Sequence, residues 1–148
     1  MALRARDHNI ELAGQVLLYP SVSGDAEAPY LDEFASPFLT KAEIQWFYDQ
    51  YVPRRDDRTN ADFAPLLADS HADLAPALIV TAEFDLFRQE GMLYRDALRA
   101  AGVPVAHRDY LGAIHGWFSV ADGSLLANKV HRDIAEFVGS NRTERGTA

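Results

Sequence analysis

The sequence predicts an α/β fold: a mainly parallel sheet of about three strands, flanked by helices. Two observations carry this prediction. Short apolar runs recur along the chain, and an amphipathic helical segment separates the second run from the third. Apolar runs that lack a polar face are typical of strands covered on both sides, as in parallel sheets. The 148 residues, 48% of them apolar, suit a single domain that spans 1–148.

The three predicted strands lie at 12–20, 75–85 and 102–112. The first reads LAGQVLLYP and is closed by Pro20, and the second is apolar from Ala77 to Ala82 apart from Thr81. The third is more polar, which favours a place nearer the edge of the sheet. The second and third strands, with the helix between them, form a βαβ unit.

Two amphipathic helices are predicted in the second half of the chain. The first lies at 86–102, with Asp85 as a candidate N-cap and Glu90 near the positive end of the helix dipole. Its apolar stripe consists of Phe87, Gly91, Tyr94, Leu98 and Ala101. The second lies at 125–139, and the tail that follows it, 140–148, is expected to fray.

A long insertion, residues 21–74, separates the first two strands. It contains one clear helix at 40–52, which begins with the capping-box pair Thr40 and Glu43. Long irregular segments inside a compact domain are often functional. The aromatic residues of this helix suit either an acyl-binding pocket or packing on the core, and their helical spacing favours packing. They are Trp46, Phe47, Tyr48 and Tyr51.

Composition excludes several classes of partner and chemistry. The net charge of −8 repels a phosphate backbone, so neither nucleic acid nor an anionic membrane surface is an expected partner. The chain has no cysteine, which removes disulfides, thiolate metal sites and a cysteine nucleophile. No apolar run approaches the roughly 20 residues of a membrane span, and the N-terminal MALRARDHNIEL has no signal-peptide core. A cytoplasmic protein is therefore expected.

An acidic and a basic side chain follow neighbouring predicted strands. Asp85 ends the second strand, and His115 follows the third in the stretch GAIHGWFSV, between Gly112 and Gly116. Because the carboxyl ends of parallel strands meet at one edge of the sheet, we expect both side chains there. A carboxylate fixes the tautomer of a neighbouring imidazole and stabilises the imidazolium that forms when the ring takes a proton. The pair is a candidate for the acid and base of an acyl-transfer triad.

Each residue also has a purely structural interpretation. Asp85 alone suits a helix cap, and His115 alone suits a loop residue bonded to backbone, but the pair at two strand ends is more specific than either. A metal site would need a third ligand, for which His107 is the nearest candidate. A half-polar strand favours a solvent-facing His107 instead, so no metal is expected. Surface positions are expected for His8, His71 and His131. Trp117 and Phe118 are interpreted as packing that anchors the histidine loop.

The stretches GQVLLYP, PALIVTAEFDLFRQEG and LRAAGVPVAHRDYLGAIHGWF resemble the bacterial hormone-sensitive-lipase-like esterases of the α/β-hydrolase superfamily. The resemblance extends from about residue 3 to residue 138. It is most specific around Asp85, with Glu90 and Gly91 behind it, and around His115. It implies that the strands are the last three of the family's sheet, and that Asp85 and His115 are the acid and base of a serine triad. It further implies hydrolysis of carboxylic esters with short or medium acyl chains, without a cofactor.

Two motifs of that family are missing from the 148 residues. The family's nucleophile lies in a G-x-S-x-G elbow and its oxyanion hole uses an HGGG-type loop, and neither motif occurs. No serine lies between glycines at the required spacing, among Ser21, Ser23, Ser36, Ser70, Ser119, Ser124 and Ser140. Residues 1–11 resemble the end of the helix that follows the elbow, so the chain is expected to begin just after the nucleophile.

Three interpretations follow. The first is the C-terminal portion of an esterase, which keeps Asp85 and His115 but has no nucleophile and is inactive alone. The second is a non-catalytic binding or assembly module derived from such an enzyme. The third is an active enzyme that uses an unconventional serine in residues 21–39. In the first, the strand edge at 14–19 lacks its partner, so we expect self-association through it or pairing with an upstream fragment.

Overall fold

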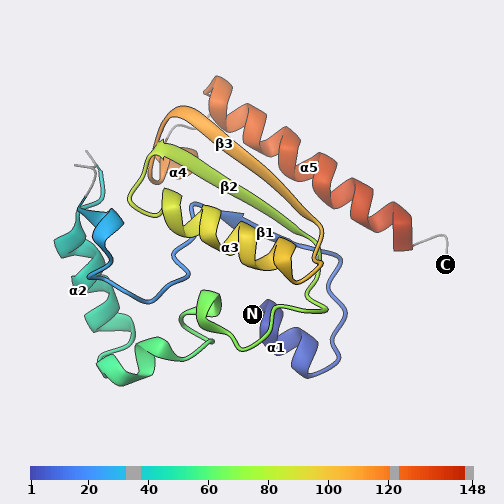
Figure 1. The fold of residues 1–148 in the computed structure, drawn as a ribbon. Coiled ribbons are helices and arrows are strands. Elements are labelled where there is room, and N and C mark those ends of the chain that lie inside the picture. The colour runs from blue at the N-terminus through green and yellow to red at the C-terminus, as the bar shows by residue number, and fades with distance from the viewer. Residues whose placement is uncertain (33–37, 121–123, 146–148) are drawn as a thin grey trace.

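The computed structural model describes residues 1–32, 38–120 and 124–145, and in this part of the chain the core is a parallel sheet of three strands (Figure 1). The strands are β1 (Gln15–Leu18), β2 (Ala77–Phe84) and β3 (Val105–Ile114), in the order β1-β2-β3. The central strand pairs in parallel with both neighbours, and the first residues of all three lie in register. The predicted α/β class with about three parallel strands is confirmed.

The central strand β2 directs its side chains alternately into two apolar layers. Ala77 and Ile79 face α3 (Arg88–Ala100), whereas Leu78 and Val80 face the opposite layer. All four are at most 1% exposed. Alternation follows from the two-residue period of a strand, and burial on both faces explains the continuous apolar run in the sequence.

Helix α3 packs closely on β2 because Gly91 has no side chain. A Cβ at Gly91 would lie 2.6 Å from Cγ2 of Thr81, which is closer than two carbon atoms approach without displacement. Tyr94 and Leu98, on the same stripe, are buried against the sheet. The helix predicted at 86–102 is confirmed, slightly shorter at both ends.

Helix α5 (Leu125–Arg145) covers the other face of the sheet, opposite α3 (Figure 1). It continues beyond the predicted end at 139, into the tail that was expected to fray. Ser140 Oγ and Asn141 Nδ2 donate to carbonyl oxygens one turn earlier, at 2.9 and 2.8 Å. The tail is therefore helical as far as Arg145, and residues 146–148 lie outside the described part.

Beside the sheet lie the N-terminal helix α1 (Ala2–Asp7) and the insertion with its main helix α2 (Lys41–Tyr51) (Figure 1). The predicted capping box of α2 is confirmed. Thr40 Oγ1 accepts from the Glu43 N–H at 3.2 Å, and Glu43 Oε2 accepts from the Thr40 N–H at 2.8 Å. Short 3₁₀ turns occur at Pro29–Leu31, Arg55–Thr59 and Pro65–Leu67.

The prediction that the aromatic residues of α2 pack on the core is right for Tyr48 and wrong for the other three. Trp46, Phe47 and Tyr51 are 57%, 54% and 80% exposed. Helix α2 contacts the core of the insertion through a narrow stripe of Ile44 and Tyr48, one turn apart. Trp46 lies on another side of the helix, whereas Phe47 and Tyr51 are each three residues from a stripe residue and flank it. The exposed Tyr51 ring still lies 6.0 Å from that of Phe63, at the rim of the insertion's core.

Glu90 fastens the beginning of the insertion to α3. Its fully buried carboxylate accepts the backbone N–H groups of Val22 and Ser23 at 2.6 and 2.8 Å, and the Tyr30 hydroxyl at 3.2 Å. Burial raises the pKa of this carboxyl above its usual range, against the lowering effect of the hydrogen bonds. The expected place in the first turn of the helix is correct, but the main partners are amides from a distant loop.

Candidate active site

Asp85 directly follows β2, at the carboxyl end of the sheet. Its side chain is fully buried, and Oδ1 accepts the N–H of Phe87 at 2.9 Å. This bond stabilises the turn that leads into α3, but the N-cap of that helix is Phe87, so the prediction of Asp85 as its N-cap is wrong. The turn also fixes the carboxylate at the edge where parallel strands place ligands.

His115 follows β3 on a short loop that begins with a distortion of the sheet. The register between β2 and β3 shifts between Ala82 and Phe84, and Gly112 has a φ of +77°. The N–H of Gly112 donates to Glu83 Oε2 at 2.7 Å, which ties the loop back to β2. Gly116, at φ +74°, closes the loop, and its missing side chain leaves room for the ring of Phe38. Both glycines satisfy conformations that other residues resist.

The structure brings Asp85 and His115 together. The Nδ1 atom of His115 lies 3.0 Å from each carboxylate oxygen of Asp85. The His115 side chain is 20% exposed, while that of Asp85 is inaccessible. Because a carboxylate only accepts hydrogen bonds, Nδ1 carries the hydrogen and Nε2 presents a lone pair. This arrangement can accept a proton at Nε2 and stabilise the resulting imidazolium.

Two aromatic rings contact the His115 imidazole. The ring of Tyr19, directly after β1, lies 4.7 Å away, and that of Phe87 lies 5.6 Å away, both at steep angles. Trp117 opens α4 (Trp117–Val120), is 4% exposed and packs against Tyr19, so its interpretation as packing behind the histidine loop is confirmed. Phe118 is partly buried in the same apolar layer.

Sequence reasoning did not assign Tyr19, Phe87 or Glu83 to the histidine site. Tyr19 follows β1, Phe87 lies two residues beyond Asp85, and Glu83 lies near the end of β2. All three therefore share the carboxyl edge of the sheet with His115. That position is the signal by which they could have been found.

The prediction that His107 faces solvent is wrong. His107 Nε2 lies 2.9 Å from the hydroxyl of Thr81, and Nδ1 lies 3.2 Å from Nη1 of Arg95. Burial, followed by the positive charge of Arg95, lowers the pKa of His107. The side chain lies between β3 and α3 because Thr81 and Asp109 provide a polar seam there.

The remaining three histidines lie away from the Asp85–His115 pair. His8 and His131 are exposed, as expected, whereas His71 is partly buried and bonds the carbonyl oxygen of Pro65 at 2.8 Å. Within the described residues, no group of three or more potential metal ligands is arranged around a common point. The same residues contain no helix with the length and apolar character needed to cross a membrane.

The described serines at the start of the insertion have hydrogen-bond partners other than His115. The hydroxyl of Ser21 pairs with that of Tyr48, and the hydroxyl of Ser23 accepts from the N–H of Asp25 at 3.1 Å. Ser36 lies outside the described residues. Among the described serines, none has a hydroxyl hydrogen-bonded to His115.

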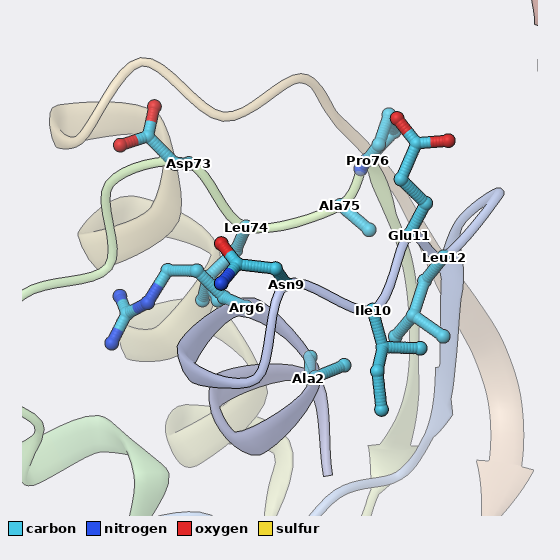
Figure 2. Close-up of a pocket in the computed structure, with 11 residues that line it drawn as sticks. Ala2, Arg6, Asn9, Ile10, Glu11, Leu12, Asp73, Leu74, Ala75 and Pro76 are labelled. Carbon is cyan, nitrogen blue, oxygen red and sulfur yellow. The ribbon is translucent and has the colours of Figure 1, made fainter.

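A hollow of about 380 Å³ lies at the opposite end of the sheet (Figure 2). It is lined by residues that precede the strands, such as Leu12 and Pro76. The Arg6 guanidinium beside it already donates to the carbonyl oxygens of Ser70 and Ala72, at 2.8 and 3.2 Å. Ligands of open α/β sheets bind beyond the carboxyl ends of the strands, so the candidate site is the Asp85–His115 edge.

A parallel sheet between α3 and α5, with an acid and a histidine at successive strand ends, is the end of an α/β-hydrolase fold. The model of the family described as alpha/beta hydrolase fold matches residues 1–119. The chain belongs to this family, on its hormone-sensitive-lipase-like branch, and corresponds to the C-terminal portion of the family's fold.

Curated relatives and solved structures agree on the class of protein. The carboxylic ester hydrolase LipN of Mycobacterium tuberculosis is 45% identical over 109 residues, which are 72% of this chain and 29% of the relative. The ethyl acetate hydrolase of Pseudomonas putida is 33% identical over 76% of this chain and 35% of its own length. An esterase of Rhizomucor miehei superposes with a TM-score of 0.88 at 34% identity, over 95% of this chain and 45% of that one. The chain thus spans about a third of these curated relatives.

Proposed function

We propose that this chain carries the acid and base of a serine-type carboxylic ester hydrolase, with Asp85 as the acid and His115 as the base. The observation that carries the proposal is the contact of His115 Nδ1 with both oxygens of the buried Asp85, at 3.0 Å. Support comes from the esterase relatives and from the absence of competing partners at Nε2 among the described residues.

In the proposed reaction, His115 Nε2 takes the proton of a serine hydroxyl as its oxygen attacks the ester carbonyl. The imidazolium then returns this proton to the alkoxide that leaves, and an acyl-enzyme remains. A water molecule repeats the cycle: its proton passes to Nε2, its oxygen attacks the acyl carbon, and the serine leaves protonated. Asp85 stays ionised throughout and stabilises the imidazolium. The expected substrates are small esters with short or medium acyl chains.

The proposal assigns the nucleophile and the oxyanion hole to a polypeptide outside these 148 residues, because neither motif occurs in them. Loss of a triad nucleophile lowers turnover by roughly 10⁶ in a well-studied protease. The chain alone should therefore hydrolyse neither p-nitrophenyl acetate nor p-nitrophenyl butyrate, and a fluorophosphonate probe should label no serine. Stoichiometric labelling of one serine would instead establish an unconventional nucleophile.

A second candidate, a non-catalytic binding or assembly module, is favoured by the exposed rings of Trp46 and Phe47 together with the missing motifs. The two candidates are separated by adding a polypeptide that carries the family's G-x-S-x-G elbow and HGGG-type loop. The esterase proposal predicts hydrolysis that depends on His115, so the His115→Gln chain is the matched control. A stable complex without hydrolysis would favour the module.

We further propose that the chain self-associates through the edge at 14–19. Among the described residues β1 pairs only with β2, and Val16 on this edge is 38% exposed. Hollows of about 370 and 90 Å³ flank Val16 on the two faces of the sheet. An apolar strand edge of this kind recruits another strand.

Sedimentation across a concentration series tests the association. We expect concentration-dependent dimers or larger species that Val16→Lys abolishes. Leu111→Lys, an exposed position on the opposite edge strand, is the matched control and should leave association unchanged. A compact monomer at every concentration would refute the proposed edge contact.

A further inference from the structure

Tyr19 has a backbone conformation that needs an explanation. It lies directly after β1 with a φ of +37°, in a region that residues with a Cβ rarely occupy. Its N–H donates to the carbonyl oxygen of Val80 at 2.7 Å, so the strained residue is held against the middle of β2. Strain of this kind persists where the surrounding structure enforces it, commonly beside functional groups.

The strained backbone places the Tyr19 ring against the His115 imidazole. The ring centroids lie 4.7 Å apart, and the planes meet at 60°. On another side the Tyr19 ring packs on the buried Trp117 at 5.3 Å, and its hydroxyl lies 3.4 Å from Ser119 Oγ. The Tyr19 ring therefore packs between the buried Trp117 and the candidate base His115.

The contact with Asp85 does not by itself fix the orientation of the imidazole ring. Because Nδ1 is equidistant from both carboxylate oxygens, the hydrogen bond holds that atom but permits the ring to swing about it. A swing changes where Nε2 points and breaks the alignment of the Nδ1–H with the carboxylate. An aromatic ring packed on the imidazole opposes this movement.

We propose that Tyr19 is a positioning residue for His115: its ring holds the imidazole in the orientation that keeps the Nδ1–H on Asp85 and Nε2 toward the substrate edge. The inference rests on the proposed function, because it gives His115 the role of base. It adds a residue from the third strand end, β1, to a site otherwise built from the ends of β2 and β3. The hydroxyl of Tyr19 is not needed for this role, whereas the ring is.

The tautomer of His115 in the purified chain tests the proposal by nitrogen-15 NMR of the labelled imidazoles, with His115→Gln to assign the signal. Wild type should show the Nδ1–H form. Tyr19→Phe keeps the ring and should retain this form, whereas Tyr19→Leu should lower the ratio of Nδ1–H to Nε2–H about threefold, as expected for an aromatic contact of ordinary strength. Tyr19→Gly removes the ring and also relieves the backbone conformation, so it should show the same loss of the Nδ1–H form by a second route.

The outcomes separate the inference from the function beneath it. If Tyr19→Leu and Tyr19→Gly both fold and keep His115 fully in the Nδ1–H form, the positioning role is overturned while the Asp85–His115 pair stands. If one of these two variants does not fold, the His115 tautomer in the other decides whether Tyr19 has the positioning role. If wild type lacks the Nδ1–H form, or Asp85→Asn leaves it unchanged, the proposed acid–base pair itself fails. His107, whose bonds do not involve Tyr19, is the internal control in every spectrum.

Discussion

The same two strands carry two histidine–aspartate arrangements, one at the edge of the sheet and one in its interior. In the edge pair, Asp85 bonds Nδ1 of His115 directly at 3.0 Å. In the interior relay, the hydroxyl of Thr81 lies between His107 Nε2, at 2.9 Å, and Asp109 Oδ1, at 2.7 Å. Residue types are shared, but only the edge pair leaves one ring nitrogen without a protein partner among the described residues.

The difference lies in which nitrogen carries the hydrogen. Arg95 can only donate, so Nδ1 of His107 accepts and its hydrogen sits on Nε2. The carboxylate of Asp85 imposes the opposite tautomer on His115. Arg88 also donates to Asp109 and holds the pKa of that carboxyl below its usual value. The interior relay is a closed chain of donors and acceptors that holds α3 on the sheet, and the edge pair is an open one that can pass a proton.

The largest expected loss of stability comes from removing the Thr81 hydroxyl at the centre of the interior relay. Thr81 is fully buried, and Thr81→Val removes the hydroxyl that serves both His107 and Asp109. Leaving the Nε2–H of His107 without an acceptor should cost about 2 kcal/mol of unfolding free energy. Urea denaturation measures the loss, and the His115 tautomer should stay unchanged. A change at His115 would mean that the two arrangements are coupled.

A smaller loss of stability, with a reversed tautomer, is expected from Asp85→Asn. The asparagine oxygen can still accept from the Phe87 N–H, so the cost should be about 1.5 kcal/mol. Its NH₂ group would then donate to Nδ1 of His115, which moves the ring hydrogen to Nε2. Nitrogen-15 NMR should show His115 in the tautomer that His107 already has. Retention of the Nδ1–H form would contradict the direct contact.

How far the sequence predicts these arrangements depends on where each residue lies. Asp85 and His115 could be predicted to meet, because strand ends and glycine-flanked loops are visible in the sequence and topology brings them to one edge. The relay could not, because the partners of His107 come from β2 and α3 and depend on register. A half-polar strand pattern does not distinguish a solvated histidine from one that is partly buried against polar neighbours.

The same limit applies to Glu90 and to the rings of α2. The first-turn position of Glu90 is readable from the sequence, but its burial follows from a loop that folds back over α3. Helical spacing on α2 is equally visible, whereas the choice of Ile44 and Tyr48 as the contact stripe depends on the shape of the insertion's core. Long-range packing, rather than local propensity, decided both.

The interior relay should also respond to pH. Burial and the charges of Arg95 and Arg99 lower the pKa of His107, against the opposing charges of Asp109 and Asp96. The folded pKa thus lies below the unfolded value of about 6.5. The unfolded state then binds the proton more readily, so stability falls as the pH drops from that value toward the folded pKa. Denaturation midpoints of wild type should fall more between pH 8 and pH 5 than those of His107→Gln; parallel curves would remove His107 as the cause.

The smallest loss of stability is expected at an exposed contact between β2 and the start of the histidine loop. Glu83 Oε2 accepts the N–H of Gly112 at 2.7 Å, at the distortion that begins the histidine loop. Glu83→Gln keeps an acceptor and should be neutral, whereas Glu83→Ala should cost about 0.5 kcal/mol, since water replaces an exposed acceptor. Amide exchange at Gly112 should nevertheless accelerate in Glu83→Ala alone, because exchange reports local opening rather than global stability. Equal exchange in both variants would show that the glycine turn holds the loop without Glu83, and the edge pair would then depend on Asp85 and the surrounding rings.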